Sequence, residues 1–144
     1  LQLGYYDAQM VIKGLGGHTY YFQGLPTAKD IVEAFAHIKK EEVLVLRSIW
    51  PSDQEDPLRY IFEEVVEHIR ITLNMTKEWT YDSLLINLIE YFMIKLKKNR
   101  FKIYDWQTYH NDILDQIKSY KKEQPDQIAL DVVLKLLIKN TKVS

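Results

Sequence analysis

The spacing of apolar side chains along this chain changes near residue 25. In residues 5–13 and 18–23, apolar and polar side chains alternate, and a period of two predicts strands that bury one face. Residues 14–17 read Gly-Leu-Gly-Gly, which provides the backbone freedom that a short chain reversal needs. Residues 1–24 hold all five glycines of the chain and are therefore expected to form a glycine-rich β-hairpin.

From residue 25 onward the apolar side chains recur every three or four residues, as in amphipathic helices. The clearest helix start is Asp56-Pro57, an N-cap residue followed by a proline suited to the first turn. Residues 81–98 are apolar on nearly every side, as expected of a helix at the centre of a bundle. Residues 43–50 could form a buried strand, but no turn residue separates them from Ile38, so a helix is favoured.

The whole pattern predicts a mainly α fold. We expect one domain, residues 1–144, in which a bundle of five or six helices (residues 25–144) follows a short N-terminal β-hairpin. The expected core includes the following positions on the apolar stripes: Phe35, Ile61, Phe62, Val65, Leu88, Phe92, Ile113, Leu114 and Leu136.

Composition narrows the class of protein without identifying its function. Of the 144 residues, 47% are hydrophobic and 27% are charged, and none is cysteine, which is typical of a soluble globular domain and excludes disulfides and thiolate chemistry. The longest apolar stretch, residues 84–96, contains Asn87, Glu90 and Lys95 and is too short and too polar to cross a membrane. The absence of cysteine and of a signal-like N-terminal segment favours a cytoplasmic location.

A net charge of −1 conceals two segments of opposite sign. Residues 53–67 contain six acidic side chains and one arginine, whereas residues 95–102 contain five basic side chains and no acid. Such segments can be solvated faces, or they can pair within one fold or between copies of it.

The basic segment also carries aromatic side chains, which suggests nucleic acid as a partner. Cations neutralise phosphates and aromatic rings stack on bases, and the residues that would do so are Lys95, Lys97, Lys98, Arg100, Lys102, Tyr104 and Trp106. The alternative is a helix end followed by a loop whose aromatic side chains anchor it to the core. An isoelectric point near 6.5 argues against nucleic acid.

Two pairs with the spacing Glu-x-x-x-His are the candidate metal ligands: Glu33 with His37, and Glu64 with His68. This spacing places both side chains on one helix face, although each pair lies on the polar side of its helix and lacks the additional inward carboxylates of di-iron bundles. Exposed pairs that merely stabilise a helix are the more common case. No catalytic constellation, phosphate-binding glycine motif or cofactor site is recognisable.

Four tyrosines lie in the expected hairpin: Tyr5, Tyr6, Tyr20 and Tyr21. Tyrosine is enriched where one end of a side chain packs against a partner and the other stays hydrated. The sequence therefore favours a non-enzymatic interaction or assembly module that binds a protein partner, or another copy of itself, through these tyrosines. A nucleic-acid-binding or regulatory protein that uses residues 95–106 is the first alternative. An enzyme or metalloprotein with a site built from distant residues is the second.

Overall fold

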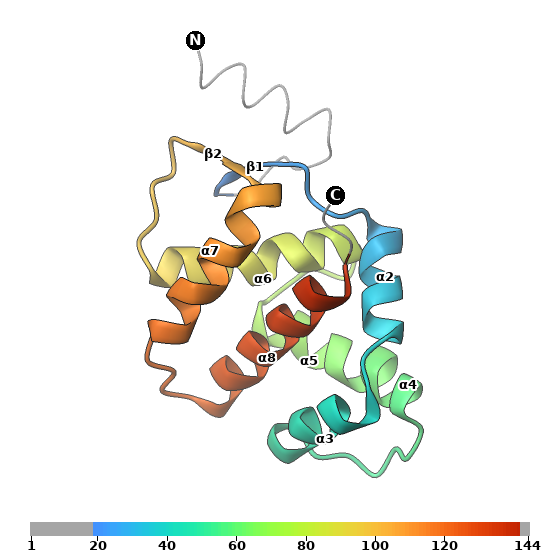
Figure 1. Cartoon of the computed structure of the whole chain (residues 1–144). Helices are drawn as coiled ribbons and strands as arrows, with labels where there is room; N and C mark the ends of the chain where they lie inside the picture. The colour runs from blue at the N-terminus through green and yellow to red at the C-terminus, as the bar shows by residue number, and fades with distance from the viewer. Residues whose placement is uncertain (1–18, 142–144) are drawn as a thin grey trace.

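The computed structural model describes residues 19–141, and within them the chain is mainly helical (Figure 1). The segment expected to form the first hairpin strand, residues 5–13, lies outside this range. Two short strands accompany the helices. In chain order the elements are β1 (Tyr21–Gln23), α2 (Ala28–Ala36), α3 (Lys40–Ile49), α4 (Pro57–Arg59), η1 (Tyr60–Val65), α5 (Val66–Thr72), α6 (Tyr81–Lys95), β2 (Ile103–Asp105), α7 (Trp106–Ser119) and α8 (Pro125–Asn140).

Three of the helices, α2, α4 and α6, begin at residues whose side chains accept backbone hydrogen bonds. The Thr27 hydroxyl accepts from the Asp30 N–H at 3.2 Å while the Asp30 carboxylate accepts from the Thr27 N–H at 2.9 Å, which is a capping box. Asp56 accepts from the N–H of Leu58 at 2.9 Å, directly before Pro57. Thr80 caps α6. Local sequence therefore determines where these three helices start.

The predicted helix that follows Asp56 is one continuous rod with a wider turn in its middle. Residues Tyr60–Val65 form a π-helix between α4 and α5. The wider turn accommodates one more residue than an α-helical turn, so that adjacent residues Val65 and Val66 are both buried. The existence of the helix was predictable from the apolar spacing, whereas the π turn was not.

The core lies between α2, α6 and α8, with α7 and the α4–η1–α5 rod around them (Figure 1). The prediction of a central helix at residues 81–98 is confirmed, since α6 buries side chains on most of its circumference. Residues 43–50 are helical, as favoured. Seven of the expected core positions are buried, while Phe62 and Leu114 lie partly buried at the edge of the core.

The expectation of an N-terminal hairpin is supported only in part, because its first strand lies outside the described residues and the strand pairing that the structure describes is parallel. β1 pairs in parallel with β2, with Phe22 opposite Tyr104, and parallel strands need a long connection, which the helices α2 to α6 supply. The alternation in residues 18–23 is confirmed where the structure describes it, because Tyr20 and Phe22 are buried and Gln23 is exposed. Residues 103–105 form a strand where a loop was expected.

The parallel pairing has a packing cause. The ring of Tyr104 lies 6.1 Å from the rings of both Tyr20 and Phe22, so pairing the two strands places three aromatic side chains in one buried cluster. Burying large aromatic side chains stabilises a fold by roughly 1.5–3 kcal/mol each. Contacts between residues more than 80 positions apart in the chain carry no local sequence signal, which is why the loop expectation failed.

Phe92 tests the assignment of the core. It is fully buried on α6, and Phe92→Ala should lower the free energy of unfolding by about 3–5 kcal/mol because a cavity replaces the ring. Ile94, on the same helix but 53% exposed, is the matched control, and Ile94→Ala should change stability by less than about 0.5 kcal/mol. Urea unfolding followed by circular dichroism measures both. A loss below about 1 kcal/mol for Phe92→Ala would contradict this core.

Candidate functional site

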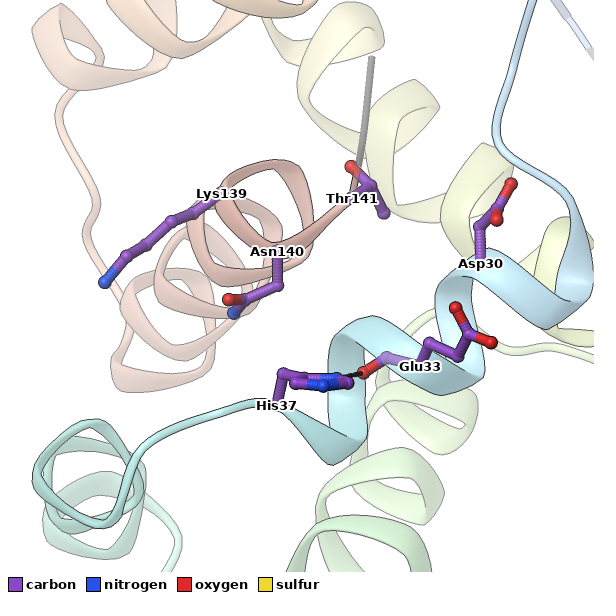
Figure 2. Close-up of a pocket in the computed structure, with 6 residues that line it drawn as sticks. All are labelled: Asp30, Glu33, His37, Lys139, Asn140 and Thr141. Carbon is purple, nitrogen blue, oxygen red and sulfur yellow. Dashed lines mark hydrogen bonds between the residues drawn. The ribbon is translucent and has the colours of Figure 1, made fainter. Parts of the chain in front are cut away.

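The first candidate metal pair lies beside a polar pocket of about 450 Å³ between α2 and the end of α8. Figure 2 shows that the His37 ring faces the backbone carbonyl of Glu33, with Nδ1 2.6 Å from that oxygen, while the Glu33 carboxylate points away from the ring and toward Asp30. The structure therefore does not bring the two side chains together as a pair of ligands. The pocket is lined by Asp30, Glu33, His37, Lys139, Asn140 and Thr141.

The second candidate pair is also separated by other contacts. The Glu64 carboxylate accepts a hydrogen bond from the Ser52 hydroxyl, and the His68 ring stacks on Trp50 at 4.8 Å with the ring planes 8° apart. Within residues 19–141, no group of three or more metal-ligating side chains converges.

Of the four tyrosines expected to bind a partner, the structure describes Tyr20 and Tyr21, whereas Tyr5 and Tyr6 lie outside the described residues. Tyr20 is 2% exposed and belongs to the core, and Tyr21 is half-buried. The Tyr20 backbone N–H donates to the Glu90 carboxylate at 2.7 Å, and its hydroxyl donates to the carbonyl of Lys98 at 3.3 Å. Tyr20 therefore acts inside the molecule.

The aromatic side chains of the basic segment divide into two sets. Tyr104 and Trp106 are buried and so cannot stack on bases in this conformation, whereas Phe101 is 72% exposed. Tyr104 and Trp106 thus anchor this segment to the core, as the alternative interpretation predicts. Phe101 is the aromatic ring that the segment presents to solvent.

We call residues 94–102 the basic edge. It contains two exposed apolar side chains, Ile94 and Phe101, and five cations: Lys95, Lys97, Lys98, Arg100 and Lys102. None of these cations forms an ion pair with the described residues. Lys95 and Lys102 instead lie over tyrosine rings, with Nζ 5.5 Å and 5.3 Å from the ring centres, contacts that leave a cation able to bind an anion.

Buried tyrosines hold the backbone of the basic edge in place. Lys97, which has the left-handed φ of 55°, reverses the chain after α6, and the Lys98 N–H returns to the carbonyl of Met93 at 3.0 Å. The Tyr104 hydroxyl donates to the Asn99 carbonyl at 2.7 Å, next to the Tyr20 contact on Lys98. These contacts attach the backbone of the basic edge to the core, while Lys95, Lys97, Arg100 and Lys102 are exposed and Lys98 is partly buried.

A second surface feature, which the sequence analysis missed, lies between α3 and α4. A pocket of about 320 Å³ is lined by Lys40, Val43, Leu44, Arg47, Glu55 and Pro57. Leu44 is 65% exposed at this pocket, and Leu58, next to Pro57, is 50% exposed. We call this feature the α3–α4 pocket. In the sequence, this pocket is indicated by four consecutive apolar residues, 43–46, of which α3 buries only Val43 and Leu46.

Trp50 and Tyr60 position the walls of the α3–α4 pocket. The Trp50 indole N–H donates to the Asp126 carboxylate of α8 at 2.8 Å, and the Tyr60 hydroxyl donates to the Trp50 carbonyl at 2.7 Å. The Arg47 guanidinium lies 4.2 Å from the centre of the Tyr60 ring. These contacts join α3, the π-helix and α8, so the pocket is built on packed elements.

The acidic segment is partly neutralised within the molecule. Arg59 pairs with Glu63 at 3.3 Å, and Arg70 pairs with Glu67. The exposed carboxylates of Asp53, Glu55 and Asp56 make no ion pair with the described residues. We call residues 53–56 the acidic loop; it borders the α3–α4 pocket through Glu55.

Comparisons with known proteins add no relative: no protein-family model, no curated protein and no solved structure matches this chain. Among residues 19–141, no helix combines the length and the apolar character needed to cross a bilayer. A function must therefore be inferred from the chemistry of the surfaces described above.

Tyr60 gives a pH-dependent test of the contacts beneath the α3–α4 pocket. Burial raises the pKa of Tyr60 to about 12. A tyrosine pKa raised by folding contributes stability that is complete below its ordinary value near 10 and is lost as the pH rises through 12. The melting temperature should fall over this range, and Tyr60→Phe should show a smaller fall while starting lower, because one hydrogen bond worth about 0.5–1.5 kcal/mol is missing.

Thermal unfolding followed by circular dichroism at several alkaline pH values measures this effect. Tyr120→Phe, at the end of α7, is the control and should follow the wild-type curve. An equally steep fall in Tyr60→Phe and in wild type would contradict the assigned role of Tyr60.

Proposed function

We propose that this protein is a non-enzymatic protein-interaction module that uses the basic edge to bind acidic, partly apolar protein surfaces. The observation that carries the proposal is the exposure of Phe101 among five cations that have no ion-pair partner within the described residues. Protein interfaces commonly consist of an aromatic centre with a polar, charged rim.

Each part of the basic edge has a defined energetic role in such a contact. Burial of the Phe101 ring in a partner would contribute about 1.5–3 kcal/mol. The surrounding cations would increase the rate of encounter with an acidic surface and select against basic ones. Because Tyr20 and Tyr104 hold the backbone at Lys98 and Asn99, less conformational entropy is lost on binding than for a free loop.

Nucleic acid is the second candidate, and the same cations favour it. Base stacking has little support, because Tyr104 and Trp106 are buried and Phe101 is the one aromatic ring of residues 95–106 that is shown to be largely exposed. With about four phosphate contacts, the logarithm of the binding constant should fall by roughly three to four per decade of salt. The cytoplasmic location remains an expectation from composition. An enzyme or metalloprotein has no specific observation in its favour among the described residues.

The proposal is tested with a fluorescently labelled helical peptide built from Glu and Leu residues. Fluorescence anisotropy should show binding to the wild-type chain, and Phe101→Ser or Arg100→Glu should each weaken it about tenfold or more. The matched controls replace an exposed apolar and an exposed basic residue outside the basic edge. Ile128→Ser and Lys118→Glu should therefore stay within about twofold of wild type.

A single-stranded oligonucleotide is titrated in parallel. Binding of the oligonucleotide with steep salt dependence, together with no binding of the acidic peptide, would replace the proposed function with nucleic-acid binding. Peptide binding that Phe101→Ser and Arg100→Glu leave unchanged would also contradict the proposal, because another surface would then be responsible.

A further inference from the structure

We propose that the partner of the basic edge is a second copy of this chain, in which Phe101 enters the α3–α4 pocket and the cations of the edge face the acidic loop. This inference rests on the proposed function and names the occupant of the same site. Its support comes from the charge, size and placement of the two surfaces.

The basic edge and the acidic loop carry opposite charges, and these charges form no ion pairs among the described residues. The five cations of the basic edge form no ion pair with the described residues. The carboxylates of Asp53, Glu55 and Asp56 in the acidic loop also form none. The internal pairs Arg59–Glu63 and Arg70–Glu67 neutralise two further carboxylates of residues 53–67, and Glu64 accepts a hydrogen bond from the Ser52 hydroxyl. What remains are the three carboxylates of the acidic loop, beside a pocket whose lining combines apolar side chains with Lys40 and Arg47.

The pocket is large enough for a phenyl ring, and three of its six lining residues are apolar. An engineered apolar cavity of about 150 Å³ holds a benzene molecule, and the α3–α4 pocket measures about 320 Å³. Val43, Leu44 and Pro57 supply apolar walls. Arg47, which already lies over the Tyr60 ring, provides a guanidinium that can also contact the face of an inserted aromatic ring.

The placement of the two surfaces excludes a contact within one molecule. In Figure 1 the connection from α6 to β2, which carries the basic edge, lies at the upper left, whereas α3 and α4 lie at the bottom right. The core helices lie between them. Each copy can therefore offer its edge to one neighbour and its pocket to another.

A contact between two different surfaces of identical copies is heterologous. Repetition of such a contact closes into a ring if its rotation permits, and otherwise extends into a filament. The chain would then act as an assembly unit, with ionic strength controlling the strength of the contact because charges at its rim are screened by salt.

The experiment uses two full-length variants that each lose one surface. Arg100→Glu with Phe101→Ser removes the edge, and Leu44→Ser with Glu55→Lys removes the pocket; all four residues are exposed, so both variants should fold, which circular dichroism checks. Sedimentation velocity measures their masses at concentrations up to about 1 mM, the weak end of useful protein affinities.

If the basic edge binds the α3–α4 pocket, the masses of the wild type, the two variants and their mixture are expected to differ. Wild type should self-associate in a concentration-dependent manner that weakens with salt, and each variant alone should be monomeric. An equimolar mixture of the two variants should form a dimer that grows no further, because it contains one intact edge and one intact pocket in contact. Ile71→Ser, which replaces an exposed apolar residue on α5, should assemble like wild type.

Three outcomes would overturn the inference. Wild type could remain monomeric throughout, either variant alone could still self-associate, or the mixture could fail to give a dimer. If the Glu/Leu peptide binds the edge while wild type stays monomeric, the self-assembly inference is wrong and the proposed function stands. If neither the peptide nor a second copy binds, both proposals are wrong.

Discussion

The buried carboxylate of Glu90 accepts a hydrogen bond from the backbone N–H of Tyr20, and the N-terminal part of the described fold depends on this contact. A carboxylate inside an otherwise apolar helix is tolerated only where donors compensate its lost hydration. This hydrogen bond places Tyr20 beside α6, and β1 begins at the next residue, Tyr21. β1 then pairs with β2, and this pairing brings the chain after α6 back over the aromatic cluster. The basic edge is therefore a consequence of a contact made on its buried side.

A comparable set of long-range contacts supports the other end of the molecule. Trp50 receives the Tyr60 hydroxyl on its carbonyl, donates its indole N–H to Asp126 and stacks against His68. Trp50, through its backbone carbonyl and its side chain, thereby joins α3, the π-helix, α5 and α8. α3 buries Val43 and Leu46, and it leaves Leu44 exposed because its neighbours cover only one of its sides. The α3–α4 pocket thus results from incomplete coverage of a well-anchored helix.

Charged side chains are paired in the interior and, among the described residues, lack ion pairs at the basic edge and the acidic loop. In the interior, Asp131 lies near the ammonium groups of Lys122 and Lys135 at 3.4 Å and 3.3 Å, and Lys122 also donates to the Ile117 carbonyl at the end of α7. This arrangement fastens α7 to α8 while compensating a buried carboxylate. At the surface, the basic edge and the acidic loop remain separate because the core lies between them. A chain with a net charge of −1 therefore has a basic edge at one end and three carboxylates beside Lys40 and Arg47 at the other.

Local sequence was sufficient for the features that depend on neighbouring residues. The capping boxes, the helix start at Asp56-Pro57, the central helix α6 and the burial of Tyr20 and Phe22 all follow from spacing or from side-chain chemistry within a few positions. Tertiary structure alone decided the partner of β1, the π turn and the separation of the metal-candidate pairs. It also decided between the two interpretations of Tyr104 and Trp106, which are buried. These depend on contacts between distant residues, since the same apolar stripe can pack against several neighbours and the choice among them is made by the shape and charge of the whole core.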